Sequence, residues 1–140
     1  MGFEVKRLTS AIGGLVSGID LRKPLSEGEL DTLYRALLEY HVLFFRKQAI
    51  SPDEQVALAK RFGAIDIHPF GRHMETHPEV GLLDQTQPKR DGANRWHTDS
   101  TFMRKPPKLA ILHAVKLPDC GGDTSWSSMI RASVCAECGR

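Results

Sequence analysis

The sequence predicts a β-rich domain of the α+β class, in which two helices lie among several short strands. Two segments begin with the Ser-x-x-Glu pattern of a helix N-terminus, one at Ser26 and the other at Ser51. Around them lie short runs rich in β-branched and aromatic residues, bounded by glycine or proline, as strands usually are. At 140 residues the chain is long enough for one domain with a sizeable core.

The first expected elements are two strands and a helix. Residues 3–8 alternate weakly between apolar and polar side chains, and residues 15–19 follow a break at two glycines. The helix should begin near Glu27, because Ser26 and Glu29 have the spacing of a capping box. Four leucines follow with helical period, and we expect all of them in the core: Leu30, Leu33, Leu37 and Leu38.

The elements that follow are expected to be a buried strand, a second helix and several further strands joined by loops. Residues 41–45 are apolar and β-prone, which predicts a buried strand, and a second helix should run from Pro52 to just before Gly63. Residues 65–94 are polar and rich in His, Pro and Gly, with a short strand at 82–84. Further strands are expected over 109–115 and from Asp123, on either side of a turn at 118–122.

A histidine and a carboxylate two residues apart, His97 and Asp99, form the candidate metal site. In an extended strand, side chains at i and i+2 point to the same face, so an imidazole nitrogen and a carboxylate oxygen can meet at one ion. They would supply two of the three ligands of a 2-His-1-carboxylate Fe(II) site. A bare His-x-Asp is also common as a surface pair or a hydrogen-bonded turn, and the spacing alone leaves both interpretations open.

The neighbouring residues give the pair a context. Residues 96–102 read Trp-His-Thr-Asp-Ser-Thr-Phe, and Pro106-Pro107 and then Gly-Gly-Asp-Thr at 121–124 follow. This order resembles the TauD/TfdA family of Fe(II)- and 2-oxoglutarate-dependent dioxygenases, and weaker resemblance extends over residues 3–129. The resemblance implies a partial double-stranded β-helix (jelly-roll) with the helices outside the sheet. It also implies that full-length relatives are homo-oligomeric.

The resemblance also implies roles for single residues. His97 and Asp99 would hold Fe(II), and Thr124 would contact a carboxylate of 2-oxoglutarate, a suitable task for a hydroxyl donor. The reaction would consume 2-oxoglutarate and O2, release succinate and CO2, and hydroxylate the substrate.

The expected substrate is a small anionic organic molecule, such as a taurine-like sulfonate or an aryloxy-alkanoate. His68, which precedes Pro69, would bind its anionic group, and Asn94 and Phe102 would also contact it. The family's substrate-contacting asparagine three residues before the tryptophan is Ala93 here, so taurine itself is not indicated. Two alternatives stay open: an inactive fragment, or a non-catalytic, cupin-like domain that binds a metal or an anion.

Composition excludes other classes of protein. The formal net charge of +2 and the scattered basic residues give no sign of nucleic-acid binding. No apolar run has the length of a membrane span, and the amino terminus lacks the apolar core of a signal peptide. Three cysteines, an odd number clustered late in the chain, indicate a reducing compartment. We therefore expect a cytoplasmic protein.

The last residues depart from the family pattern. Residues 130–140 show no helical apolar stripe, and the distal histidine and arginine of the family have no counterpart in the chain. We therefore expect a dioxygenase-like part over 1–129 and an atypical tail over 130–140, as in a truncated or frameshifted chain. Cys135 and Cys138 have the spacing of half a zinc site or a redox pair, but an accidental pair fits better. His73 and His77 are expected in a loop at the rim of the site, and His113 within a strand.

Overall fold

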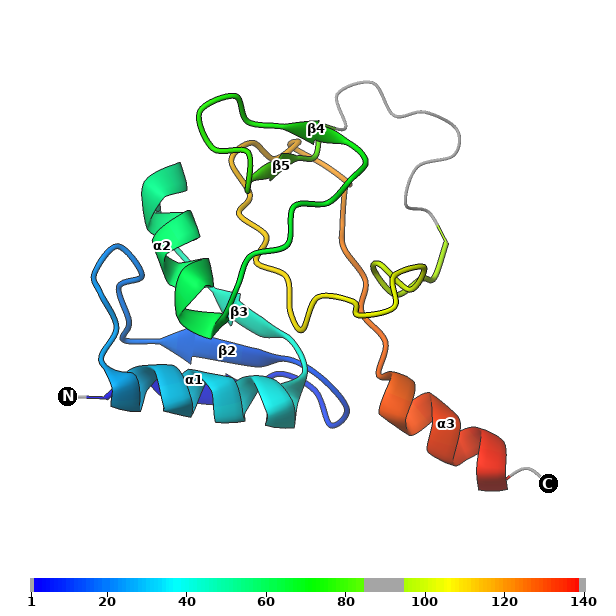
Figure 1. Ribbon diagram of the computed structural model, residues 1–140. Helices are drawn as coiled ribbons and strands as arrows, with labels where there is room; N and C mark the ends of the chain where they lie inside the picture. The colour runs from blue at the N-terminus through cyan, green and yellow to red at the C-terminus, as the bar shows by residue number, and fades with distance from the viewer. Residues whose placement is uncertain (1, 85–94, 139–140) are drawn as a thin grey trace. The chain divides into compact units, whose positions relative to one another are not determined.

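The computed structural model describes residues 2–84 and 95–138, with side chains up to residue 134 (Figure 1). The chain divides into two compact units, each described by itself below. The first unit contains Met1–Ser51 and Ala114–Arg140, and the second contains Pro52–His113.

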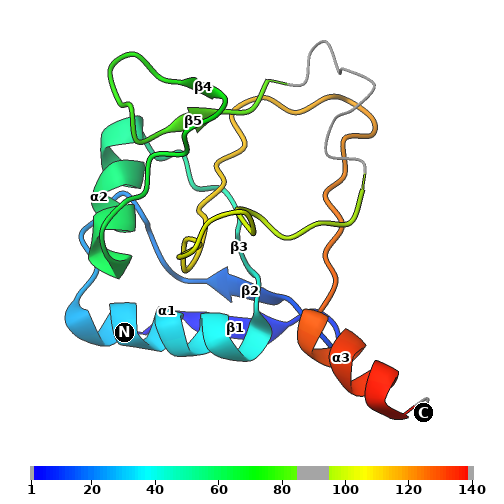
Figure 2. The same cartoon turned by 45° about the vertical axis from the view of Figure 1, so that its right-hand side comes forward.

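A three-stranded sheet forms the centre of the first unit. Strand β2 (Gly14–Ser17) lies between β1 (Glu4–Arg7), with which it is antiparallel, and β3 (Leu43–Phe45), with which it is parallel. The parallel pair needs a crossover connection, and helix α1 (Glu27–Tyr40) supplies it by running along the sheet (Figure 2). These three strands and the helix confirm the elements predicted up to residue 45.

The predicted capping box begins α1. The Ser26 hydroxyl accepts a hydrogen bond from the Glu29 N–H at 3.3 Å, and the Glu29 carboxylate accepts one from the Ser26 N–H at 2.8 Å. The hydrogen bond from the Ser26 hydroxyl, followed by that from its N–H, lowers the pKa of Glu29. Two of the free N–H groups of the first turn are satisfied in this way.

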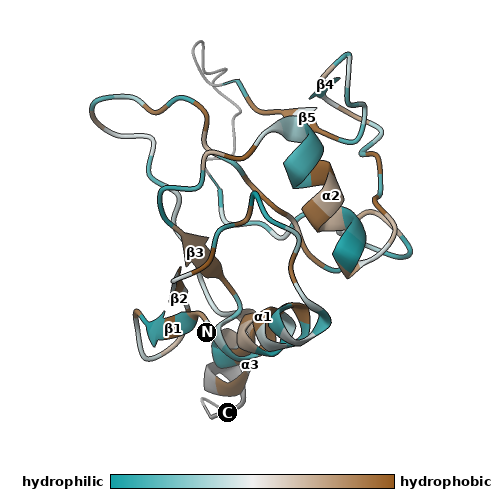
Figure 3. Ribbon diagram, turned by 90° about the vertical axis from the view of Figure 1, so that its left-hand side faces the viewer, coloured by the Kyte–Doolittle hydropathy of each residue, from teal (hydrophilic) through white to brown (hydrophobic). Residues whose placement is uncertain are grey.

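The apolar face of α1 is narrower than the leucine pattern predicts. Leu33 and Ala36 are buried and Leu30 and Leu37 are half-buried, whereas Leu38 is 60% exposed, so its assignment to the core is wrong. One position beyond Leu37 already turns a side chain about 100° around the helix, away from the sheet. Figure 3 shows the mixed hydropathy of α1 beside the hydrophobic β2 and β3.

Residue His41 ends α1 and delays the next strand. It adopts a left-handed conformation (φ 64°), and its N–H donates to the Leu37 carbonyl at 2.7 Å. A residue in this cap cannot also be extended, so β3 begins at Leu43 rather than at residue 41. Its three residues are half-buried rather than buried, which corrects the expectation of a fully covered strand.

The core of the first unit consists of apolar side chains, and Gln48 makes hydrogen bonds beside it. The buried side chains of this core are Val16, Leu21, Leu25, Leu33, Ala36 and Ile50. The Gln48 side chain accepts a hydrogen bond from the Leu21 N–H at 2.9 Å and donates one to the Ile19 carbonyl at 3.1 Å. Both groups of the amide therefore hold the segment between β2 and α1, which has no strand or helix of its own.

The turn at 118–122 forms as predicted, but the strand expected from Asp123 is wrong. Gly121 and Gly122 have φ values of 76° and 74°, a region that suits glycine. A Cβ at Gly122 would also lie 3.1 Å from Pro118 Cγ. The residues after this turn are irregular up to α3. Within the described residues they have no partner strand, and an extended segment without one has no ladder of hydrogen bonds to hold it.

Helix α3 (Met129–Cys138) covers most of the expected atypical tail, where the sequence shows no helical apolar stripe. Its described apolar side chains Met129, Ile130 and Val134 are exposed, which explains why the sequence shows no buried stripe. The Arg131 guanidinium donates to the Ser10 carbonyl at 2.8 Å and so ties α3 to the connection between β1 and β2.

The second unit contains helix α2 and a small hairpin. Helix α2 (Pro52–Phe62) begins at the predicted proline and ends before Gly63. Strands β4 (Arg72–His73) and β5 (Gly81–Leu82) are antiparallel, and β5 overlaps the strand predicted over 82–84 at Leu82 alone. The strand expected over 109–115 is wrong, since this segment is irregular. Within the second unit, the Gln55 side chain donates to the Ile111 carbonyl at 3.2 Å and holds the segment beside α2.

No helix of the described residues is long and apolar enough to cross a membrane. The strands of the described residues form the three-stranded sheet and the hairpin. The partial jelly-roll implied by the resemblance therefore remains a prediction for this chain.

Candidate metal and substrate site

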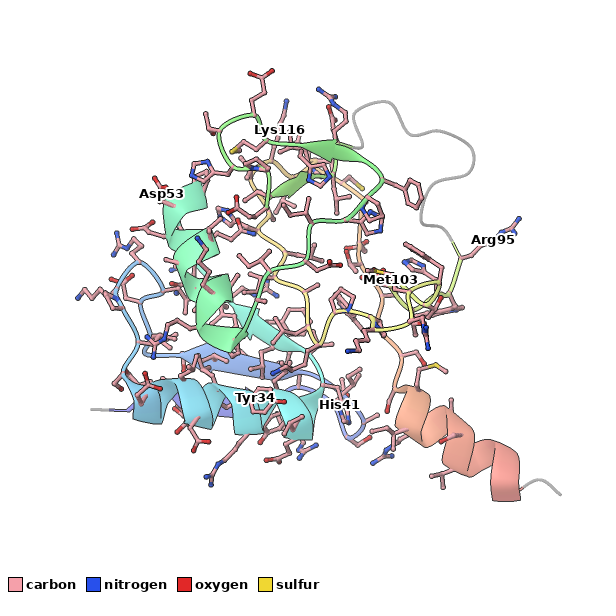
Figure 4. The ribbon with its side chains drawn as sticks, in the orientation of Figure 1. Tyr34, His41, Asp53, Arg95, Met103 and Lys116 are labelled. Carbon is pink, nitrogen blue, oxygen red and sulfur yellow. The ribbon has the colours of Figure 1, made fainter. Side chains whose placement is uncertain are left out.

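The candidate metal pair lies in a tight loop rather than in the extended strand expected from its spacing. Residues 97 and 98 are irregular and a turn follows from Asp99. Ser100 has a φ of 56°, and the Met103 N–H donates to its carbonyl at 3.0 Å, so the chain reverses directly after Asp99. The chain around Met103 coils tightly in Figure 4, while the Arg95 side chain points away from it. The pair is therefore positioned by a turn.

One hydrogen bond fixes the orientation of the His97 imidazole. Its Nδ1 lies 2.7 Å from the Arg95 carbonyl, which can only accept, so Nδ1 carries the hydrogen. In the neutral ring, Nε2 then presents a lone pair, and it lies 3.4 Å from Asp99 Oδ1. Two acceptors face each other across this gap. A cation between them would be bound by both, and a protonated imidazole would form an ion pair instead.

The two donor atoms lie close enough for one metal ion to contact both. His97 Nε2 and Asp99 Oδ1 are 3.4 Å apart. The imidazole–carboxylate donor set is the one used by facial-triad iron sites, and the hydrogen bond from Nδ1 to a carbonyl is typical of metal-binding histidines. Both side chains are exposed, which leaves other positions accessible. Among the residues that the structure describes, no third His, Cys, Asp or Glu joins them.

Three rings form the candidate substrate-binding cluster. His68 lies 5.9 Å from Phe70 and 5.8 Å from Phe102, and the two phenylalanine rings are 5.9 Å apart, as measured between ring centroids. The His68 and Phe102 rings meet edge to face, at an interplanar angle of 90°. Phe70 and Phe102 are exposed, at 69% and 63%. The structure thus brings together His68 and Phe102, two residues predicted to bind substrate, 34 positions apart in the sequence.

The two other histidines of this region make structural contacts. The Nε2 of His73 donates to the His68 carbonyl at 2.9 Å. His77 bonds to Thr76 through Nδ1 and lies 2.9 Å from Asp53 of α2 through Nε2. Figure 4 shows Asp53 at the start of α2. Neither histidine joins a group of three metal ligands within the described part of the chain. His77 lies in a loop as expected, whereas His73 belongs to strand β4, so its assignment to a loop is wrong.

Sequence reasoning missed two groups of this site. Phe70 completes the ring cluster, although its position directly after His68 and Pro69 was a usable signal. The Arg95 carbonyl orients His97, and a main-chain group carries no signal in the sequence.

Several predicted residues are not part of this arrangement. Thr124 belongs to the first unit, where it is exposed in an irregular segment. Asn94 lies outside the described residues. His113 is half-buried in an irregular segment, so its assignment to a strand is wrong: the expected strand did not form there. The side chains of Cys135 and Cys138 also lie outside the described part, and their role stays a prediction.

Comparison with known proteins identifies relatives over most of the chain. The taurine catabolism dioxygenase TauD, TfdA family matches residues 4–133. An alkylsulfatase of Acinetobacter baylyi is 37% identical over 126 residues, covering 89% of this chain and 39% of the relative. An alpha-ketoglutarate-dependent sulfate ester dioxygenase of Pseudomonas putida is 34% identical over 130 residues, covering 92% of this chain and 42% of the relative.

A solved structure agrees with these relatives. A Burkholderia xenovorans protein provisionally described as an alpha-ketoglutarate-dependent taurine dioxygenase superposes with a TM-score of 0.66 at 35% identity, over 76% of this chain and 39% of that protein. The chain therefore spans about two-fifths of the length of the proteins it matches. The family match covers nearly all of its residues. The chain belongs to the TauD/TfdA dioxygenase family.

Proposed function

We propose that this chain is the amino-terminal part of an Fe(II)- and 2-oxoglutarate-dependent dioxygenase that hydroxylates a small anionic organic substrate. The observation that carries the proposal is the pair of acceptors at His97 and Asp99, 3.4 Å apart, with the imidazole oriented by the Arg95 carbonyl. Membership of the dioxygenase family supports it. A cytoplasmic location and assembly of the full-length protein into a homo-oligomer belong to the same proposal.

His97 and Asp99 would hold the iron, and a histidine outside this chain would complete the triad. When bound, iron supplies the oxidation that uses O2 and 2-oxoglutarate, releases succinate and CO2, and transfers one oxygen atom to the substrate. The contribution of His97 is a lone pair at Nε2, held there because Nδ1–H is bonded to Arg95. The contribution of Asp99 is a negative charge beside that nitrogen.

Thr124 is proposed to orient 2-oxoglutarate by donating its hydroxyl hydrogen to a carboxylate. A hydroxyl bonded to an ionised acceptor makes a stronger hydrogen bond than one bonded to a neutral group. Gly121 and Gly122 precede it with left-handed backbones, which makes the turn before Thr124 specific to glycine.

The ring cluster is proposed to bind a substrate with an anionic end and an apolar body. In its protonated form, with Nδ1–H on the Phe70 carbonyl, the His68 imidazole would donate its Nε2–H to the anionic group. The exposed rings of Phe70 and Phe102 would contact the carbon skeleton. Asn94 is retained as a further substrate contact. The two relatives named for alkyl sulfates and sulfate esters support this substrate class over taurine.

Succinate formation tests the proposal. The 140-residue chain and a chimera extended with the remaining segment of the Acinetobacter baylyi relative are incubated aerobically with Fe(II), ascorbate and 2-oxoglutarate. The substrates are alkyl sulfates, taurine and a phenoxy-acid. We expect substrate-dependent succinate from the chimera, lost in its His97→Ala variant, and none from the 140 residues alone. A chimera that folds, binds Fe(II) and releases no succinate would contradict catalysis.

One observation favours a second function, a non-catalytic domain that binds a metal or an anion. Within the described residues the metal pair has no third ligand. This alternative predicts Fe(II) binding that is unchanged by the extension, together with no succinate from either form. The dioxygenase proposal predicts tighter Fe(II) binding by the chimera, because a third ligand is added.

A further inference from the structure

We propose that His73 is a positioning residue of the substrate site: its ring holds the segment that presents His68, and thereby sets the orientation of the His68 imidazole against Phe102. The nature of the ligand rests on the proposed function. The geometry can be tested without it.

His68 is held at two points. Its carbonyl accepts a hydrogen bond from His73 Nε2 at 2.9 Å. Its own imidazole is tied to the main chain, with Nδ1 2.7 Å from the Phe70 carbonyl. The first contact fixes the backbone of His68 and the second fixes the ring relative to that backbone. Only the first comes from a separate element of structure, strand β4.

The hairpin gives His73 a fixed base. Its backbone pairs with Gly81 of β5, and beyond this pair the Met74 N–H donates to the Val80 carbonyl at 3.0 Å. Residues 64–71, which contain His68, form no helix or strand. A site residue in such a loop keeps its geometry only when a more rigid element supports it. The hairpin provides this support through one side chain.

The other nitrogen of His73 argues against a purely structural role. Because Nε2 donates to a carbonyl, Nδ1 of the neutral ring is an acceptor, and this atom is buried without a partner among the described residues. A buried acceptor without a donor is destabilising. A phenylalanine ring would fill the same place without that cost. Stability alone therefore does not explain a histidine here, whereas the N–H directed to His68 does.

A shift of the His68 segment would affect the loop that carries His97 and Asp99 through one ring contact. Phe102 belongs to the turn that follows Asp99, and its ring meets the His68 ring at 90° and 5.8 Å. If the His68 segment loosens, the imidazole and the aromatic surface shift together. Substrate affinity should then fall while the fold persists.

Two variants and a matched control test the proposal in the 140-residue chain. His73→Phe keeps a ring but removes the donor, and His73→Gln keeps an amide N–H near the position of Nε2. His77→Gln changes the other histidine of the same region, whose partner is Asp53 rather than His68. The readouts are the thermal midpoint, the nuclear Overhauser effect between the His68 and Phe102 ring protons, and the dissociation constant for hexyl sulfate.

For His73→Phe we expect a thermal midpoint close to that of the wild type, because the lost hydrogen bond to His68 and the removal of the unpartnered Nδ1 offset each other. We also expect loss of the ring-to-ring signal and binding of hexyl sulfate weakened about fivefold to tenfold. His73→Gln should recover most of the signal and affinity, and His77→Gln should alter neither. If His73→Phe does not fold, His73→Asn replaces it, because its amide is too short to reach the His68 carbonyl.

A His73→Phe protein that keeps both the ring signal and the affinity would overturn the proposal, as would equal losses in His77→Gln. Failure of the wild-type chain to bind hexyl sulfate would count against the proposed substrate class alone. The ring signal would then decide the role of His73 by itself.

Discussion

Replacing Gly14 with alanine should destabilise the first unit, because the backbone of β2 passes too close to its neighbours to admit a Cβ. That atom would lie 2.9 Å from Val5 Cγ1, 3.0 Å from Tyr40 Cγ and 3.1 Å from Leu43 Cδ2. Its three neighbours come from β1, the end of α1 and β3, so no single side chain can move to make room. Such overpacking costs about 1–3 kcal/mol.

The gain from a less flexible unfolded chain opposes this cost. A glycine-to-alanine change contributes about 0.4–1 kcal/mol of stability where the site accepts it. The net effect of Gly14→Ala should be a loss of about 1–2 kcal/mol, or a thermal midpoint lowered by about 5–10 °C.

Gly28→Ala is the matched control for this prediction. Gly28 lies in the first turn of α1, and a Cβ there meets no atom within 4 Å. Alanine should therefore stabilise the helix, by about 0.5–1 kcal/mol. Urea and thermal unfolding followed by circular dichroism measure both variants. Equal or higher stability of Gly14→Ala would refute the close packing of β2.

Two further predictions concern the same unit. Ser26→Ala should cost about 1 kcal/mol of folding stability through loss of the helix cap. The folded-state pKa of Glu29 lies below its unfolded value. The stability that Glu29 contributes is therefore present above the unfolded pKa and disappears as pH falls through the folded pKa. Acid titration of Glu29→Gln should accordingly show a flatter loss of stability than the wild type, and parallel curves would contradict the cap. Gln48→Ala should cost about 1–3 kcal/mol, since the Leu21 N–H and the Ile19 carbonyl both lose a partner. Gln48→Glu keeps only the acceptor, so its free energy of unfolding in urea should lie between those of the wild type and Gln48→Ala. A value equal to that of the wild type would show that the donor is unimportant.

Features that depend on neighbouring residues were predictable from the sequence. The cap of α1 requires only Ser26 and Glu29, and the start of α2 requires only Pro52 at the first position. The turn at Gly121 and Gly122 is local in the same sense. In each case, residues within four positions of one another are sufficient to produce the feature.

Features that depend on a distant partner were not predictable in this way. The strand expected over 109–115 lacks a partner strand within the described residues, and an apolar run does not reveal whether one is present. Leu38 fits the helical spacing of the apolar residues in α1, but its side chain lies outside the face of the helix that packs on the sheet. Helix α3 has no buried described face, so periodicity carried no signal for it.

The candidate site shows both cases. His97 and Asp99 do converge, but a turn at Ser100 follows them in place of the expected strand. The i, i+2 spacing correctly predicted that the two side chains meet, but it predicted a strand where the structure has a turn. The meeting of His68 with Phe102 came from the family resemblance, since nothing local relates residues so far apart.

Metal binding tests the central claim most directly. Fe(II) under anaerobic conditions, or Co(II) followed by its visible absorption, is titrated into the wild-type chain and into His97→Ala, Asp99→Ala and His77→Ala. His77 is the matched control because it also lies beside a carboxylate, 2.9 Å from Asp53, while Thr76 occupies its other nitrogen. We expect weak binding by the wild type and by His77→Ala, and its loss in both His97→Ala and Asp99→Ala. Equal binding by all four proteins would contradict the assignment of His97 and Asp99 as metal ligands.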